Sequence, residues 1–84
     1  MAVSNSGGPM TSIYLEDYRR VLGQLVEARK RSGVTQQELA KRLRRPQSFV
    51  SKFENGERRL DVVEFVKIAR LVGVEPNKLL KTIE

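Results

Sequence analysis

The fold is decided by the stretch Gln36–Leu60, QQELAKRLRRPQSFVSKFENGERRL, near the middle of the 84-residue chain. Its apolar residues form two short runs with spacings of three and four, which is the spacing of one face of a helix. The polar residues RRP separate the runs, so the stretch predicts two helices joined by a turn of three or four residues. Ala40 gives the first helix a small residue where the second crosses it, and Val50 with Phe53 gives the second helix a face toward the core.

The opposite face of the second helix is polar. At about 100° per residue from Val50, the side chains that point away from the core carry hydroxyl, amide and ammonium groups. Gln47 lies at the N-terminal end of this helix, where a side chain that points sideways still extends beyond the body of the domain. Such groups bond to base edges in the major groove of DNA, and two helices in this arrangement are the helix-turn-helix layout. The candidate base-reading residues are Gln47, Ser48, Ser51 and Lys52, with Asn55 on the same face.

Helix signals extend in both directions from this pair. A helix with an apolar face is expected from about Ser12 to Ser32, and Gly33 ends it because glycine adopts the left-handed turn at low cost. Thr35 is the expected N-cap of the second helix, in a capping box with Glu38. The third helix is expected to begin at Pro46 and to run to Asn55, before Gly56. Asp61 and Glu64 form the capping box of a fourth helix, which ends at Gly73. A fifth helix begins at Pro76.

No stretch alternates with a period of two, so the prediction is an all-α domain of five short helices. Residues 1–10 are rich in Ser, Gly, Asn and Pro without periodicity, and they are expected to form a disordered tail ahead of a domain spanning residues 11–84.

Composition narrows the class of function. The chain has no Cys and no His, which removes thiol nucleophiles, imidazole bases and ordinary zinc sites, and no cofactor or metal is expected. The remaining acids and bases are scattered, so an enzyme is not expected. No apolar run reaches the length of a membrane helix. The absence of Cys leaves the redox compartment open, but a chain this small without disulfides is more typical of the cytoplasm, and we expect a cytoplasmic protein. Sixteen Lys and Arg residues against ten Asp and Glu residues give the chain a formal net charge of +6 at pH 7. Residues 35–60 contribute most of this excess, with seven basic and three acidic residues. Charge alone leaves open whether this is a DNA-binding patch or a merely soluble surface.

The segments QQELAKRL, SFVSKFENGERR and LVGVEP resemble the phage-repressor (Cro/XRE-type) class of helix-turn-helix domains, over residues 13–82. The resemblance implies a lambda-repressor-like fold in a bacterial or phage-encoded transcription regulator. Such domains bind double-stranded DNA as homodimers, and the expectation is a repressor that reads a palindromic operator through the third helix. An antitoxin, which uses the same fold to contact a partner protein, is the alternative.

The resemblance also assigns roles to matching residues. Gln36 matches a position that bonds a DNA phosphate, and Gln47, Ser48 and Lys52 match base-reading positions. Arg29 and Glu54 match a structural ion pair, which is costly to break if it is buried and weak if it is exposed. Each polar residue has a plain alternative as an exposed, solvated side chain, and Lys52 can equally lie along a phosphate. The candidate phosphate contacts are Gln36, Arg44, Arg45, Asn55, Arg58 and Arg59.

Three positions leave structural alternatives open. Arg44 stands where the family usually has glycine, so a left-handed backbone there would be strained by about 1 kcal/mol or more. Phe49 either packs against Phe53 or contacts a thymine methyl group, and packing is favoured. The fourth helix is apolar around most of its circumference, so it is a core helix, part of a dimer surface, or both. The expected dimer surface comprises Val62–Val72, Leu79, Leu80 and Ile83.

Overall fold

The computed structural model describes residues 9–83, with side chains from Leu15 onward. It contains α1 (Pro9–Arg31), α2 (Gln36–Leu43), α3 (Gln47–Glu54), α4 (Val62–Leu71) and α5 (Pro76–Leu80), and no strand within the described range. The all-α prediction with five helices is therefore confirmed. Residues 1–8 of the expected tail lie outside the described residues, whereas Pro9 and Met10 already belong to α1, which begins before the expected start at Ser12. No helix within residues 9–83 combines the length and apolar character needed to cross a membrane.

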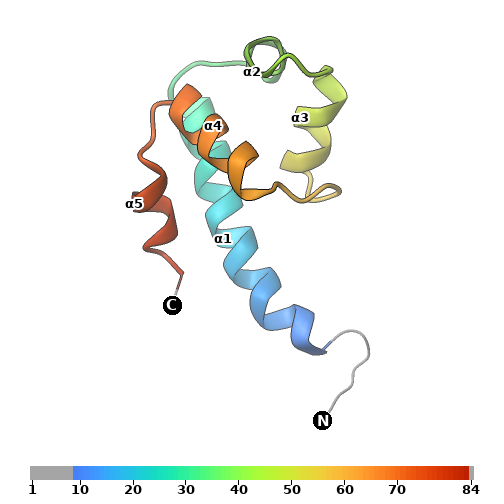
Figure 1. Cartoon of the computed structure of the whole chain (residues 1–84), viewed down its shortest axis with the longest axis vertical. Coiled ribbons are helices and arrows are strands. Elements are labelled where there is room, and N and C mark those ends of the chain that lie inside the picture. The colour runs from blue at the N-terminus through green and yellow to red at the C-terminus, as the bar shows by residue number, and fades with distance from the viewer. Residues whose placement is uncertain (1–8, 84) are drawn as a thin grey trace.

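The helices are arranged around α1, which runs most of the length of the molecule (Figure 1). The pair α2 and α3 lies at one end, with α3 and α5 on opposite sides of the body (Figure 1). Helix α2 packs against α3 and α4, while α1 contacts both α3 and α5. The pair α2 and α3 therefore packs against two other helices, α1 and α4, and α5 packs against these two in turn.

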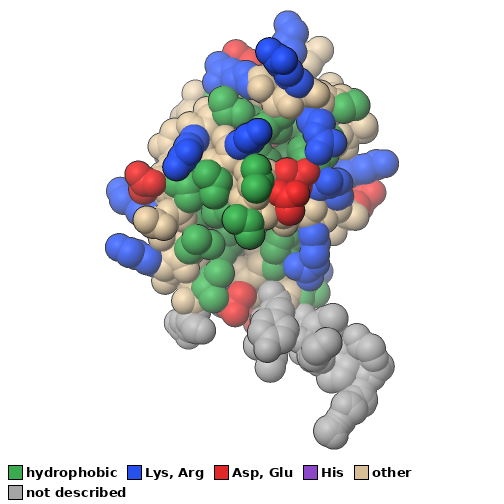
Figure 2. Space-filling view, in the orientation of Figure 1, with side chains coloured by type: hydrophobic (Ala, Val, Ile, Leu, Met, Phe, Trp, Pro, Cys, Tyr) green, Lys and Arg blue, Asp and Glu red, His purple; other side chains and the backbone are tan. Residues whose placement is uncertain are grey.

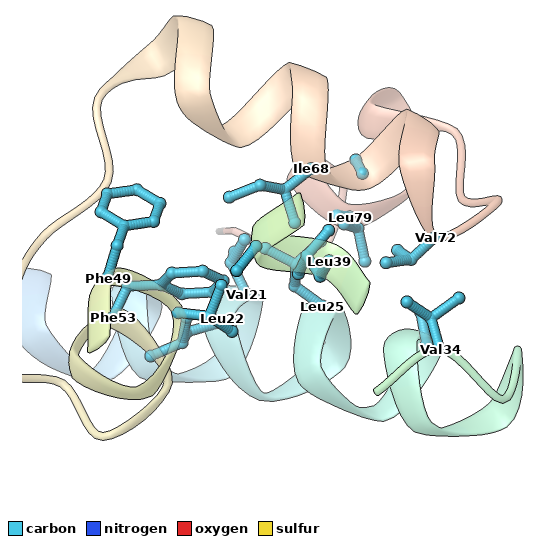
Figure 3. Close-up of a cluster of buried hydrophobic side chains, with 14 residues drawn as sticks. Val21, Leu22, Leu25, Val34, Leu39, Phe49, Phe53, Ile68, Val72 and Leu79 are labelled. Carbon is cyan, nitrogen blue, oxygen red and sulfur yellow. The ribbon is translucent and has the colours of Figure 1, made fainter. Parts of the chain in front are cut away.

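The core takes at least one side chain from every helix (Figure 3). Leu25, Leu39, Val50 and Ile68 come from α1 to α4 and are at most 1% exposed. Burying side chains of this size contributes about 1.5–3 kcal/mol each. The residues expected to face inward, Ala40, Val50 and Phe53, are buried, and Val21 and Val34 are further core residues that the spacing did not indicate.

Helices α1 to α4 all end in the same left-handed turn. In α1, α3 and α4 a glycine takes the positive φ, between 80° and 82°. In α2, Arg44 takes it with φ 58°, and it is the single non-glycine residue with positive φ within residues 9–83. The turn closes with bonds from Arg44 N to Lys41 O (3.1 Å) and from Arg45 N to Ala40 O (2.9 Å). The expected left-handed backbone is thus present, and it is strained because Cβ crowds the carbonyl oxygen that follows.

Arg44→Gly is expected to raise the free energy of unfolding by about 0.5 kcal/mol. The substitution relieves about 1 kcal/mol of left-handed strain, and the greater freedom of glycine in the unfolded chain offsets part of the gain. Urea unfolding followed by circular dichroism measures the change. Arg42→Gly is the matched control, because Arg42 lies in helical backbone, where glycine costs about 1 kcal/mol. Loss of stability in both variants alike would contradict the prediction.

Besides the earlier start of α1, the N-termini of two helices, α2 and α3, differ from the expectation. Asp61 and Glu64 form the expected reciprocal capping box. At Thr35, Oγ1 accepts from Glu38 N (3.0 Å), but the Glu38 carboxylate accepts from Arg42 instead of completing the box. Pro46 is the N-cap of α3, without a side-chain capping bond, so α3 starts at Gln47 and not at Pro46 as expected.

Candidate nucleic-acid interface

The two faces of α3 are divided as the sequence predicts. Val50 and Phe53 are at most 1% exposed and Phe49 is 7% exposed, so the apolar face is fully committed to the core. On the opposite face Ser51 is half-buried, and the exposed side chains are Gln47, Ser48, Lys52 and, at the C-cap, Asn55. The polar groups of α3 are therefore available at the surface of the protomer.

Phe49 is a packing residue. Its ring lies 5.6 Å from the ring of Phe53, centroid to centroid. The guanidinium carbons of Arg45 and Arg58 lie 4.4 and 4.7 Å from the Phe49 centroid, so two cations cover the part of the ring that the core leaves open. Of the two alternatives for Phe49, the structure favours packing over contact with a thymine methyl group.

Glu54, at the end of α3, is the centre of a buried polar group of three side chains. Arg29 of α1 donates to it through Nε (2.6 Å) and Nη2 (3.1 Å), and Arg29 Nη1 donates to Val34 O (2.7 Å). The Arg29 and Glu54 side chains are 10% and 7% exposed. The expected ion pair is therefore present and buried, the case in which losing one partner is costly.

Gln36 is the third member of this group. Its Nε2 donates to Glu54 Oε1 (2.8 Å), a bond that the sequence did not predict. The bond fixes the Gln36 side chain at the N-terminus of α2, where the first backbone N–H groups have no helical partners. The residue expected to contact a phosphate is thus held in place by the end of α3.

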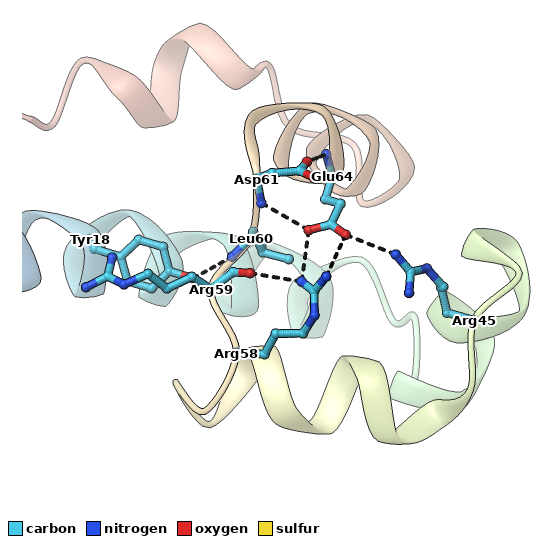
Figure 4. A network of polar contacts seen from close by, with 7 residues as sticks. All are labelled: Tyr18, Arg45, Arg58, Arg59, Leu60, Asp61 and Glu64. Carbon is cyan, nitrogen blue, oxygen red and sulfur yellow. Dashed lines mark hydrogen bonds and ion pairs between the residues drawn. The ribbon is translucent and has the colours of Figure 1, made fainter.

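Two of the expected phosphate-contacting arginines are bound to Glu64 of α4 (Figure 4). Arg58 donates to both carboxylate oxygens (3.0 and 3.1 Å), and Arg45 Nη2 donates to Oε2 (3.0 Å). The hydrogen bond from Arg58 lowers the pKa of Glu64 below its ordinary value and raises the pKa of Arg58. Because the folded-state pKa of Glu64 is depressed, its contribution to stability is present above its unfolded pKa and is lost as the pH falls through the folded value.

Three further expected phosphate contacts, Arg44, Asn55 and Arg59, carry no acidic partner among the described residues. Arg59 lies over the Tyr18 ring, 4.5 Å from the centroid, and the Tyr18 hydroxyl accepts a bond from Leu60 N (3.2 Å). Arg44 is exposed, and Asn55 is exposed at the end of α3. These three side chains flank the polar face of α3 on the adjoining turns.

The sequence identified Glu64 only as a capping residue. Its partners Arg45 and Arg58 come from two different turns, and Arg45 lies 19 positions away. No local spacing signals such a pair. The aromatic supports of the arginines were missed for the same reason, because Tyr18 reaches Arg59 only through the packing of α1 against the α3–α4 loop.

The expected dimer surface needs a correction. Leu79 is 4% exposed, and Ile68, Ala69 and Val72 lie in the core, so these residues offer almost no exposed area to a partner. The exposed large apolar residues are Val62 (77%), Val63 (62%), Leu80 (46%) and Ile83 (45%). The C-terminal half of α4 therefore belongs to the core, whereas its first residues present apolar side chains to the surface.

Hydrophobic side chains gather on the face of the molecule over α4 and α5, with Lys and Arg side chains around them (Figure 2). A groove of about 320 Å³ lies between α1 and the ends of α4 and α5. Its apolar lining includes Val21, Leu25, Phe65, Leu80 and Ile83, with Asp17 and Asp61 also lining it.

The five-helix domain with an outward polar face on α3 defines a helix-turn-helix protein. The family model named helix-turn-helix matches residues 25–79. A solved structure of an XRE-family like protein from Pseudomonas syringae pv. tomato str. DC3000 is 51% identical, with a TM-score of 0.83, and the match covers 88% of this chain and 90% of that one. No curated protein matches the chain. The chain belongs to the XRE family of helix-turn-helix proteins, and it is a DNA-binding transcription regulator.

Proposed function

We propose that this protein is a repressor that binds a palindromic operator as a homodimer, with α3 of each protomer in the major groove. The observation that carries the proposal is the division of α3, whose apolar face is buried while Gln47, Ser48 and Lys52 face outward. A helix with this division can enter the groove without exposing core residues, and its outward groups are of the kind that bond to base edges.

Each polar residue has a role in the proposal. Gln47, Ser48, Ser51 and Lys52 read base edges, where glutamine suits adenine and lysine suits guanine. The phosphate contacts flank them on the N-terminus of α2, the α2–α3 turn and the α3–α4 loop. Such contacts set the register of the protein on the duplex but carry no sequence information. These phosphate-contacting residues are Gln36, Arg44, Arg45, Asn55, Arg58 and Arg59.

The corrected apolar surface supports the homodimer. Val62 and Val63 open α4, directly after the loop that follows α3, and Leu80 and Ile83 lie at the end of the described chain. Val62, Leu80 and Ile83 line the same groove, whereas Val63 lines a separate depression beside Phe49. Two copies that meet there about a two-fold axis bury the surface of both protomers at once.

Selection of bound duplexes from a random pool tests the proposal. The expected product is an inverted repeat with half-sites about one helical turn apart, 10–10.5 base pairs centre to centre. A single asymmetric site would contradict the dimer, and a pool without enrichment would contradict sequence-specific binding. Sedimentation of the protein with the selected duplex gives the stoichiometry directly.

Gln47→Ala is expected to lower affinity for the selected operator by about 1–3 kcal/mol and to leave binding to random DNA unchanged, because a base contact discriminates between sequences. Arg59→Ala is the matched comparison. Arg59 has no acidic partner within the described residues, and its loss should weaken binding to both duplexes equally. Fluorescence anisotropy titrations of both duplexes at one salt concentration measure the two ratios. Equal effects of Gln47→Ala on operator and random DNA would show that Gln47 does not read a base.

A further inference from the structure

Glu64 is bonded at both oxygens by groups from three parts of the chain. Oε1 accepts from Asp61 N (3.0 Å) and Arg58 Nη1 (3.0 Å). Oε2 accepts from Arg58 Nη2 (3.1 Å) and Arg45 Nη2 (3.0 Å). The Glu64 side chain is 16% exposed, whereas those of Arg45 and Arg58 are 45% and 39% exposed. The carboxylate is therefore fixed on the inner side of the two guanidinium groups.

The two arginines are constrained from a second direction by Phe49. Both guanidinium groups lie over its ring, and both bond to Glu64 at the same time (Figure 4). Arg58 Nη1 also donates to Arg59 O (2.9 Å), so three of its five N–H groups are used within the protein. A DNA phosphate must compete with this carboxylate for both cations.

We propose that Glu64 is a specificity-determining positioning residue, which holds Arg45 and Arg58 against Phe49 and so limits the affinity of the domain for non-specific DNA. The inference rests on the proposed function, because it assumes that α3 reads bases while the arginines meet phosphates. Phosphate contacts supply most of non-specific binding and its salt dependence. In the operator complex the base contacts of α3 hold both arginines at the backbone, whereas on random DNA the phosphates alone must draw them from the carboxylate. Glu64 therefore weakens non-specific binding more than operator binding, and it raises the ratio of specific to non-specific affinity.

The test compares Glu64→Gln with Glu57→Gln. Each substitution removes one negative charge. Glu57 is exposed in the α3–α4 loop and has no ion pair among the described residues, so its loss reports net charge alone. Glutamine at position 64 keeps an oxygen that can accept from Asp61 N. Affinities for the selected operator and for a random duplex are measured at several NaCl concentrations by fluorescence anisotropy, and thermal unfolding verifies that each variant is folded.

Glu64→Gln is expected to raise affinity for random DNA at 100 mM NaCl about tenfold more than Glu57→Gln does. On random DNA the log–log salt slope should steepen by up to about 0.9 for each of the two arginines, whose phosphate contacts the carboxylate weakens in the wild-type protein. The ratio of operator to random affinity should fall in Glu64→Gln and stay near the wild-type value in Glu57→Gln. Identical behaviour of the two variants would overturn the proposal, and so would weaker binding of Glu64→Gln to both duplexes at an unchanged slope.

A second pair of variants tests the inference if Glu64→Gln does not fold. Arg59→Ala removes an arginine without an acidic partner in the described chain, and it should make the salt slope shallower by about 0.9. Arg45→Ala removes one that Glu64 holds, and it should change the slope by less than half as much. Equal changes would overturn the inference. A wild-type protein that shows no operator preference would overturn the proposed function instead, so the two failures are distinguishable.

Discussion

Arg29→Met is expected to lower the free energy of unfolding by about 3–5 kcal/mol, because it leaves the buried Glu54 carboxylate without its cation. Gln36 would remain as the partner that the structure gives Glu54, and a neutral amide does not compensate a buried charge. A domain of this length is stable by about 4–13 kcal/mol in total, so the expected loss is a large fraction of the whole stability. Urea denaturation followed by circular dichroism measures the loss.

Arg31→Met is the matched control for this prediction. Arg31 is an exposed arginine in the same last turn of α1, and its loss should cost less than about 1 kcal/mol. The double variant Arg29→Met/Glu54→Leu should recover much of the lost stability, because an apolar pair leaves no charge buried. If Arg29→Met lowered the free energy of unfolding no more than Arg31→Met does, the ion pair between Arg29 and Glu54 would not stabilise the fold.

Operator affinity is expected to fall about 10²- to 10⁴-fold when NaCl rises from 50 to 200 mM. About four to seven phosphate contacts release a comparable number of counterions, and the log–log slope is about −0.9 per contact. The candidate contacts lie at the N-terminus of α2 and in the turns on either side of α3. Equilibrium titrations of the operator duplex over this range give the slope.

Two measurements make the salt prediction decisive. Thermal unfolding at each NaCl concentration serves as the control, because the domain must stay folded over the whole range. The same titration on random DNA should give at least as steep a slope, since non-specific binding depends on phosphates alone. A slope near zero on both duplexes would mean that the arginines flanking α3 do not meet the backbone.

Local features of the fold could be predicted because each depends on a few neighbouring residues. Gly33, Gly56 and Gly73 mark helix ends, and Asp61 with Glu64 marks a helix start, without reference to the rest of the molecule. The outward face of α3 follows from helical geometry once Val50 is placed in the core.

Features that depend on packing between distant segments could not be predicted. Leu79 and Leu80 are neighbours in a helix of five residues, and only the position of α5 against α1 and α4 decides that Leu79 is buried and Leu80 exposed. The bonds from Gln36 to Glu54 and from Arg45 to Glu64 join residues 18 and 19 positions apart. Helical periodicity indicates which face is polar but not which partner a polar side chain finds.

The buried carboxylate of Glu54 joins the end of α3 to the start of α2 and to the last turn of α1. The contacts of Glu54 thus fix α3, proposed to enter the major groove, relative to the start of α2, proposed to meet the DNA backbone, before DNA is bound. Association then avoids most of the entropic cost of ordering loops and side chains, which is the general advantage of a preorganised binding surface. A binding surface of this rigidity should bind DNA of matching shape with high affinity, and it should bind weakly to duplexes that require the protein to change conformation.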